Sequence, residues 1–313
     1  TRDGIMEIMT KTIVLATGCR ERTARQIFIN GTRPYGVYTA GTAQYFTNIL
    51  GALPAKRCVI LGSGDVGLIM ARRLTLEGVM VVGVYEILSN PSGLTRNVCQ
   101  CLEDYDIPLH LSHTVTRLYG ENRLEAVDVA KVDKDLRPIA GTEEHIPCDA
   151  LILSVGLIPE NELAESLEVP IDPRTKGPLV DENCMTQVGG VFSCGNAMQV
   201  NDLVDYVTLT AEKAGKMAAR YEKRPTESIP VSASNDFMYV VPQRINEPIT
   251  EGKIDFYFRS KQTEKNVTLS IRSNGMEIYK KKYAHLRPPE MEKLSLDIKS
   301  LNVCNAIEFT LAR

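Results

Sequence analysis

The chain has 313 residues, and its 36 Lys and Arg against 39 Asp and Glu give a formal net charge of −3. Hydrophobic residues make up 43 % and charged residues 24 %, which is ordinary for globular proteins and argues against disorder, collagen and coiled coil. This length predicts about two domains, no long basic run suggests a nucleic-acid partner, and no apolar run approaches the ~20 residues that cross a bilayer.

The N-terminal segment begins at Thr1 without an initiator Met and leads at once into a short strand. We therefore expect the sequence to be a fragment of a longer protein. Residues 11–17 (KTIVLAT) predict a buried strand that ends at Gly18, and residues 44–53 predict a short helix. Pro54 then marks a boundary.

A strand–turn–helix–strand unit is predicted after this boundary. Residues 58–61 (CVIL) form an apolar run that is typical of a buried parallel strand, and they meet the glycine-rich segment 62–67 (GSGDVG). A helix follows, and Gly78 lies where its C-terminal cap is expected. The next apolar strand, 79–85, is closed by Glu86. The apolar face predicted for the helix comprises Val66, Ile69, Met70 and Leu74.

Each glycine of the segment 62–67 has a physical reason to bind a dinucleotide. Gly62 allows a tight turn, Gly64 lets a diphosphate approach the backbone, and Gly67 lets the helix pack on the strand. The helix N-terminus then offers N–H groups and the positive end of its dipole. Glu86 follows Gly62 by 24 residues, close to the roughly 20 expected for a carboxylate that binds the adenosine ribose. The other candidate residues of the turn are Ser63, Asp65 and Val66.

Two alternatives stay open for this turn. One is a glycine-rich turn in an ordinary α/β domain, and the other is NADP(H) binding. A carboxylate at Glu86 repels a 2′-phosphate, and the segment 87–96 that follows contains Arg96 as its only basic residue. The pattern therefore favours NAD(H) over NADP(H).

Downstream segments continue the alternation of strands and helices. Residues 94–105 and 207–221 predict helices, and 190–196 (GVFSCGN) predicts a short strand that runs into a glycine turn. Asp202 and Asp205 lie near the start of the second helix, where capping is the favoured role and substrate contact the alternative. Further strands are predicted at 109–111, 114–118, 124–132 and 151–155, the last ending at Gly156.

The character of the sequence changes after residue 225. The segment 231–313 contains several runs of strand length, and Ser273-Asn274-Gly275 is a hairpin signal, so we expect a small all-β module. An alternative for this module is an independent carbohydrate- or protein-binding domain. The segment contains Tyr257, Tyr279 and Tyr283 but no Trp, which gives little support to an aromatic sugar-binding platform. Its predicted strands are 238–241, 254–258, 267–271, 276–279 and 307–311.

Cysteine and histidine usage gives little sign of a metal or disulfide site. The eight cysteines are scattered, which suits reduced thiols in a cytoplasmic protein rather than a disulfide framework. The four histidines show no metal-ligand spacing with cysteines or acidic residues, so we expect no metal site.

Three further segments carry a resemblance to a known family. Val14–Gly18 (VLATG), Asp149–Pro159 (DALILSVGLIP) and Val191–Asn196 (VFSCGN) surround the glycine-rich unit in the chain. With it, they resemble the pyridine nucleotide-disulfide oxidoreductase superfamily of flavoproteins, in which an FAD-binding domain is interrupted by an NAD(P)-binding domain. The resemblance covers about residues 10–222. Within this superfamily, the chain is similar to subunits of proline, opine and amine dehydrogenases and to chains that accompany a glycerol-3-phosphate dehydrogenase-like flavoprotein.

The resemblance implies an α/β fold. A Rossmann-like NAD-binding domain would be inserted in a partial FAD-binding domain and followed by the C-terminal all-β module. The implied parts are 1–54 (remnant of the FAD-binding domain), 55–155 (NAD-binding domain), 156–225 (second part of the FAD-binding domain) and 226–313 (a small β-sandwich-like domain).

The resemblance also implies site residues and an activity. Thr17, Gly18, Gly195 and Asn196 would contact FAD, and Gly156 would line the nicotinamide side. The implied reaction is hydride transfer between NAD(H) and FAD, with electrons exchanged with a partner dehydrogenase subunit or a small acceptor. A small-molecule substrate and a homo-oligomer are further expectations. No catalytic side chain is assigned, because the cofactors carry the chemistry.

Three features depart from the superfamily's pattern. The N-terminal FAD fingerprint is missing, since only 61 residues precede Gly62, and Asn196 replaces the usual acidic residue. Thr39-Ala40-Gly41-Thr42 stands where a thioredoxin reductase-like chain carries its redox cysteines, so we exclude dithiol–disulfide chemistry there. Cys19 is either a plain buried thiol or a neighbour of the flavin ring. The alternative function is a non-catalytic NAD-binding or assembly subunit, or a fragment that lacks functional FAD.

Overall fold

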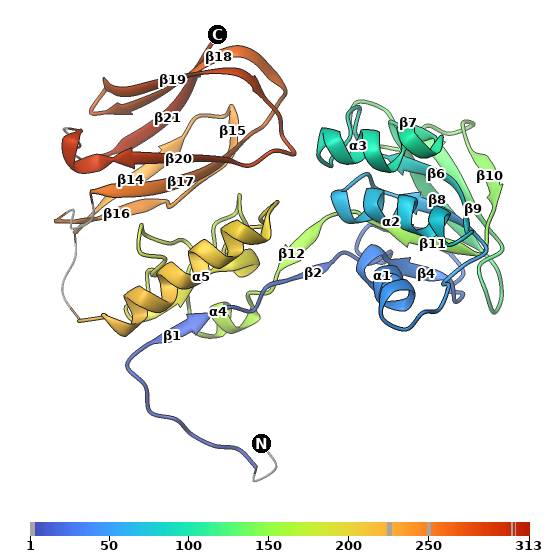
Figure 1. Cartoon of the computed structure of the whole chain (residues 1–313), viewed down its shortest axis with the longest axis horizontal. Helices are drawn as coiled ribbons and strands as arrows, with labels where there is room; N and C mark the ends of the chain where they lie inside the picture. Colours follow the sequence, from blue (N-terminus) through green and yellow to red (C-terminus); the bar gives the residue numbers. More distant parts are fainter. Residues whose placement is uncertain (1–3, 224–226, 249–251, 302, 304) are drawn as a thin grey trace. The chain divides into compact units, whose positions relative to one another are not determined.

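The computed structural model describes residues 4–223, 227–248, 252–301, 303 and 305–313 (Figure 1). The chain divides into two compact units, one of residues 21–157 and one that joins the residues up to 20 with those from 158 onward. It passes between them at two short strands, β2 (Cys19–Glu21) and β12 (Leu157–Pro159). The start at Thr1 and the boundary expected at 225–226 lie outside the described residues.

A five-stranded parallel sheet forms the centre of the unit of residues 21–157. Its spatial order is β4–β11–β5–β6–β7, so the chain leaves β5 toward one side and returns on the other side as β11. At such a reversal of strand order, loops at the carboxyl ends of the strands leave room for a ligand. The strands are β4 (Val37–Thr39), β11 (Ala150–Leu153), β5 (Arg57–Leu61), β6 (Met80–Glu86) and β7 (Leu109–Leu111).

Alternating residues of β5 explain why both faces of this sheet are covered. Cys58 and Ile60 belong to the apolar core formed with the helices. Val59 and Leu61 belong to a second core formed with another sheet. Because successive side chains of a strand point to opposite faces, an unbroken apolar run suits a strand that is buried on both sides.

Three helices lie over one face of the parallel sheet, and a second sheet lies over the other. The helices are α1 (Ala40–Asn48), α2 (Asp65–Leu76) and α3 (Thr95–Cys101), the last followed by the 3₁₀ turn η1 (Glu103–Tyr105). The second sheet has the order β10–β9–β8–β3. Its strands are β10 (Glu144–Pro147), β9 (Ala126–Lys131), β8 (His113–Tyr119) and β3 (Asn30–Gly31).

The apolar face predicted for α2 is wrong at two positions. Val66 and Ile69 are 38 % and 42 % exposed, whereas Leu68 and Ala71 are fully buried. Gly67 packs closely on Ser154, directly after β11, and this contact turns the side of α2 that carries Gly67, Leu68 and Ala71 inward.

The other unit begins with a parallel pair of short strands, β1 (Ile13–Leu15) and β13 (Val191–Ser193). The 3₁₀ turn η2 (Gly195–Ala197) follows β13, and a short loop leads to α5 (Val204–Ala219). A further short helix, α4 (Glu162–Ser166), lies after β12. Within the described residues, no helix combines the length and apolar character needed to cross a membrane.

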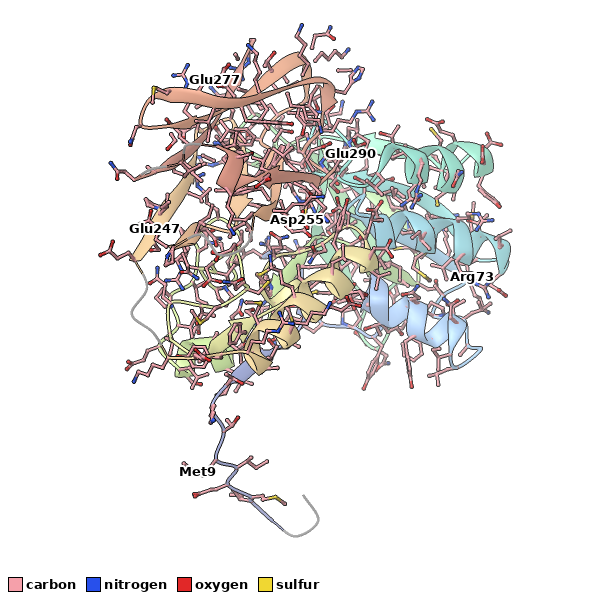
Figure 2. The ribbon with its side chains drawn as sticks, turned by 60° about the vertical axis from the view of Figure 1, so that its left-hand side comes forward. Met9, Arg73, Glu247, Asp255, Glu277 and Glu290 are labelled. Carbon is pink, nitrogen blue, oxygen red and sulfur yellow. The ribbon has the colours of Figure 1, made fainter. Side chains whose placement is uncertain are left out.

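The C-terminal segment is the predicted all-β module, built from two sheets around one apolar core. One sheet has the order β16–β14–β21–β18–β19 and the other β15–β17–β20. The hairpin predicted at residues 273–275 is confirmed, because Asn274 and Gly275 have φ of +49° and +79° and Ser273 pairs with Met276. Figure 2 labels Asp255 on β17 and Glu277 on β19. The strands are β14 (Glu227–Ala233), β15 (Phe237–Val241), β16 (Arg244–Glu247), β17 (Lys253–Ser260), β18 (Glu264–Ser273), β19 (Met276–Leu286), β20 (Glu292–Asp297) and β21 (Ile307–Ala312), with the 3₁₀ turn η3 (Ile298–Ser300) after β20.

One boundary differs from the expected division. Residues 21–54, which we assigned to the remnant of the FAD-binding domain, lie in the same compact unit as residues 55–155. The physical reason is that β4 pairs with β11 and thereby becomes an edge strand of the parallel sheet.

Candidate functional site

The glycine-rich turn closes β5 and packs against Ser154, which follows β11. Gly62 has φ of +92°, and a Cβ added there would lie 2.1 Å from the carbonyl oxygen of Ser154. A Cβ on Gly67 would lie 2.5 Å from the Cβ of Ser154. The amide N–H of Gly67 donates to Ser154 Oγ at 3.1 Å. The turn therefore requires glycine at these two positions for the reasons that the sequence predicted, a tight turn and close packing of helix on strand.

The start of α2 presents backbone N–H groups on its exposed side. Gly64 is the N-cap residue and contributes no side-chain hydrogen bond. No acceptor is recorded among the described residues for the amide N–H groups of Asp65 and Val66. The Asp65 carboxylate instead accepts from the Leu94 amide at 2.8 Å and from Asn97 Nδ2 at 2.7 Å, which ties α2 to the start of α3. Such an N-terminus suits an anionic group of a ligand.

Glu86 lies beside this turn, at the end of β6, and is only 3 % exposed. Its Oε2 accepts from the Ser63 amide at 2.9 Å, from Ser63 Oγ at 2.6 Å and from Ser92 Oγ at 2.9 Å. Its Oε1 accepts from the Leu88 amide at 3.0 Å. The carboxylate thus holds the glycine-rich turn and the loop after β6 together, and the Leu88 amide is the one partner of Oε1 within the described part of the chain.

Gly156 completes the candidate residues of this unit. It follows β11 two residues after Ser154 and has φ of +98°, with no atom within 4 Å of the position of an added Cβ. Its carbonyl oxygen accepts from the Arg22 amide at 3.2 Å. The turn 62–67, Glu86 and Gly156 therefore all lie at the carboxyl ends of β5, β6 and β11.

The candidate flavin residues lie in the other unit. Thr17 Oγ1 donates to the Glu160 carbonyl, and the Gly18 carbonyl accepts from the Glu160 amide at 2.9 Å. Gly18 has φ of +73° and open space where a Cβ would point. The Gly195 amide donates to Thr210 Oγ1 at 3.1 Å, which fixes the turn after β13 to α5.

Asn196 brings the two flavin segments together. Its Nδ2 lies 3.4 Å from the Sγ of Cys19, the residue that follows Gly18 in the chain. Its Oδ1 accepts from the Asn201 amide at 3.0 Å. The four residues predicted from the resemblance therefore belong to one local arrangement around η2.

The position compared with a redox motif is the start of α1. Thr39 is its N-cap, and its Oγ1 lies 2.9 Å from Thr42 Oγ1. The Glu21 carboxylate accepts the Gly41 N–H, at 2.9 Å from Oε1 and 3.1 Å from Oε2. The cap at Thr39 explains why α1 begins at Ala40, four residues before the predicted start at residue 44.

Sequence reasoning missed Ser154 and Ser92 as supports of the turn and misjudged Asp202. Among the residues that the structure describes, no side chain caps α5, and Asp202 instead binds Arg259 of the β module. The pattern that could have predicted the role of Ser154 is a small polar residue directly after a buried strand. Nothing in the local pattern pointed to Asp202 and Arg259, which are 57 residues apart.

A comparison with known protein families identifies the family of this chain. Residues 2–219 match the profile of a family described as pyridine nucleotide-disulphide oxidoreductase. The chain belongs to this family. The predicted resemblance and the α/β fold class are thereby confirmed, and the chain is part of a family of oxidoreductases.

Similar proteins include two named enzyme subunits. The chain is 24 % identical over 224 residues to a protein of Agrobacterium tumefaciens strain Ach5 that is named as an opine oxidase subunit, covering 68 % of this chain and 43 % of the relative. It is 29 % identical over 176 residues to hydrogen cyanide synthase subunit HcnB of Pseudomonas aeruginosa, covering 51 % and 37 %. The chain thus spans less than half the length of these two curated relatives.

A solved structure shares the fold. An FAD-dependent pyridine nucleotide-disulphide oxidoreductase from Desulfovibrio vulgaris is similar with a TM-score of 0.55 and 20 % identity, covering 81 % of this chain and 61 % of the other. Lactococcus lactis thioredoxin reductase gives a TM-score of 0.55 at 19 % identity, covering 67 % and 66 %.

Proposed function

We propose that this chain is part of a flavin-dependent oxidoreductase that transfers hydride between NAD(H) and FAD. The observation that carries the proposal is the turn 62–67, packed on Ser154 and opening into the N-terminus of α2. The N–H groups of Asp65 and Val66 hold the diphosphate of the nicotinamide cofactor, and Gly64 gives it access to the backbone.

NAD(H) is proposed as the cofactor in preference to NADP(H). Glu86 lies at the end of β6, beside the turn, and Oε1 retains accepting capacity toward a ribose hydroxyl. A 2′-phosphate would meet this buried carboxylate at the cost of like-charge repulsion. Gly156, at the end of β11, lines the nicotinamide side of the same site.

The residues around η2 fit one part of FAD. Gly18 adjoins open space, while Ser193 Oγ and Asn201 Oδ1 are buried without a partner among the described atoms. A hydroxyl and an amide oxygen of this kind suit the hydroxyl groups of the ribityl chain. Together with Thr17, Gly195 and Asn196, they would hold the ribityl and diphosphate part of FAD. When bound, FAD supplies the group that accepts the hydride.

The electrons are proposed to pass to or from a partner dehydrogenase subunit or a small acceptor. Two relatives are themselves named as subunits, one of opine oxidase and one of hydrogen cyanide synthase. We propose the same kind of assembly here, in the cytoplasm, with a small-molecule substrate bound outside the residues assigned above. Dithiol–disulfide exchange is not part of the proposal, because Thr39 and Thr42 stand at the start of α1.

A charge placed at the start of α2 tests the proposal. Val66→Asp puts a carboxylate where the diphosphate would bind, and Asp in the first turn of a helix does not destabilise the helix. NADH binding, measured by fluorescence titration of the full-length protein, is expected to weaken by at least about tenfold, which is ~1.4 kcal/mol. The unmodified protein is expected to bind NADH more tightly than NADPH in the same titration.

Ile69→Asp is the matched control, because Ile69 is exposed to a similar extent on the same helix, one turn further on. The control should bind NADH as the unmodified protein does, with an unchanged melting temperature. Equal affinity of the Val66→Asp protein and the control would contradict the assigned site.

An alternative function rests on one observation. The sequence contains a single G-x-G-x-x-G segment, and it lies in the unit of residues 21–157. A subunit that binds NAD(H) without flavin would need no more than this one turn. A visible absorption spectrum separates the two functions: a flavin band bleached by NADH under anaerobic conditions supports the oxidoreductase, whereas NADH binding without any flavin band supports the alternative.

A further inference from the structure

The loop between η2 and α5 is held by the C-terminal β module. Arg259 on β17 donates from Nη2 to Asp202 Oδ1 and, at 3.4 Å, to the Val200 carbonyl. The Met291 amide donates to Asp202 Oδ2 at 2.6 Å. Both charged side chains are largely buried, at 11 % and 13 % exposed. Figure 2 labels Glu290, which precedes Met291 in the segment that approaches Asp202.

Arg259 is itself fixed within the β module. Its Nε donates to the hydroxyl of Tyr239 at 2.8 Å, and its Nη1 donates to the carbonyl groups of Pro288 and Pro289. A guanidinium that donates in three directions has little freedom to move without breaking several hydrogen bonds. The module therefore presents a rigid cation to the loop.

The held loop leads directly to the candidate flavin residue Asn196. Asn201, next to Asp202 in the chain, donates from its amide and from Nδ2 to Asn196 Oδ1, at 3.0 and 3.2 Å. Gln199 is fully buried, and its Nε2 lies 3.7 Å from Met291 Sδ. A continuous set of contacts thus links Arg259 to Asn196 through the loop.

We propose that the C-terminal β module positions the flavin-binding turn, with Arg259 and Asp202 as positioning residues that hold Asn196 in place. This rests on the proposed function, since it takes η2 as part of an FAD site. The module is then a structural support of the cofactor site rather than a separate sugar- or protein-binding domain. The ion pair matters here for geometry, because a buried pair adds little net stability while the loss of one partner leaves a buried charge.

A second contact between the module and the rest of its unit provides the control. Asn246 on β16 donates from Nδ2 to Asp181 Oδ2 at 2.6 Å and from its amide to Glu182 Oε2 at 2.9 Å. Asn246 is 9 % exposed, similar to Arg259, but neither Asp181 nor Glu182 belongs to the loop that carries Asn196. Asn246→Ala therefore weakens the attachment of the module without touching that loop.

The experiment compares Asp202→Asn and Arg259→Lys with Asn246→Ala in the full-length protein. Asp202→Asn keeps the side-chain volume. Arg259→Lys keeps the positive charge but loses the planar guanidinium that donates in several directions. FAD affinity is expected to fall about tenfold in Asp202→Asn, because the loss of a residue that orients a binding group typically has an effect of this size. The fall in FAD affinity should be smaller in Arg259→Lys. The flavin absorption maximum should shift in the same variants. FAD affinity in Asn246→Ala and NADH affinity in all three should stay within about twofold of the unmodified protein.

Hydrogen exchange keeps the two proposals separable. Asp202→Asn should speed exchange of the Asn201 amide more than Asn246→Ala does, whether or not flavin is present. If the unmodified protein binds NADH but no FAD, the flavin part of the proposed function fails, while faster exchange of that amide would still establish the support of the turn by the module. If Asp202→Asn lowers only the melting temperature, with FAD affinity, flavin spectrum and Asn201 exchange equal to those of Asn246→Ala, the positioning role is overturned.

Discussion

Ser154 shows how one small side chain determines which residues the glycine-rich turn accepts. Its carbonyl oxygen excludes a Cβ at Gly62, and its own Cβ excludes one at Gly67. Its hydroxyl accepts the Gly67 amide, so the contact is both steric and polar. The dinucleotide turn therefore depends on a residue more than 80 positions away in the chain.

Gly67→Ala is expected to destabilise the protein by about 1–3 kcal/mol, because overpacking at a tight contact forces the backbone to shift. Urea unfolding followed by circular dichroism measures the change. Gly215→Ala is the matched control: Gly215 lies inside α5 with nothing within 4 Å of an added Cβ, so the same substitution should stabilise by about 0.5–1 kcal/mol.

Adding Ser154→Gly to Gly67→Ala should recover part of the loss, because it removes the Cβ that the new methyl group meets. Additive losses in the double variant would show that the strain at Gly67 has another source.

At the scale of elements, the loop 181–185 and strand β16 meet at a pair of buried carboxyl groups. Burial and, to a lesser extent, the neighbouring Asp181 carboxylate together raise the pKa of Glu182 to about 7. Burial also raises the pKa of Asp181, against the opposing effect of its hydrogen bond from Asn246. A carboxyl pKa above its unfolded value means that the folded state holds a proton that the unfolded state has released.

This contact predicts that the protein loses stability as pH rises. The contribution of Glu182 is fully present below pH ~4.5 and is lost as pH rises through about 7, with a size of about 3 kcal/mol. Glu182→Gln should flatten the decline in melting temperature between pH 5 and 8, with Asp181 causing the remaining slope. The exposed Glu165→Gln serves as control, and identical pH profiles of the two variants would refute the assignment.

Local pattern explains which of these elements were predictable. The apolar run at β5 and the hairpin at Asn274 follow from side-chain alternation and from residues that favour positive φ. The buried face of α2 was mispredicted because apolar spacing placed Val66 and Ile69 inward, whereas the contact at Gly67 sets the rotation of the helix. The Arg259–Asp202 pair joins distant segments, and only the folded chain brings them together.

On the scale of the whole molecule, the two compact units carry different parts of the proposed chemistry. The turn 62–67 and Glu86 belong to residues 21–157, while η2 and the β module share the other unit. Tyr239 and Val241 of the module lie in one apolar cluster with residues of β13 and α5, so the module and the η2 region share a core. We therefore expect these two regions to unfold together.

Differential scanning calorimetry should show two transitions. NADH at about 100 times its dissociation constant should stabilise the unit that binds it by ~2.7 kcal/mol and shift one transition only. At the same NADH concentration, the Val66→Asp protein should gain about half of this stabilisation or less, because its affinity is expected to be at least about tenfold weaker. Movement of both transitions by NADH would contradict this expectation, because it would show that NADH binding stabilises both units.

The neighbouring hydroxyl groups of Thr39 and Thr42 mark a position at the start of α1 where two cysteines would lie close together. Cysteines at both positions would place two sulfur atoms at a helix start, where the dipole favours the reactive thiolate. The Glu21 carboxylate already occupies that helix end and would keep the new thiols protonated. Cysteines introduced at these two positions would therefore form a more reactive pair when Glu21 is replaced as well.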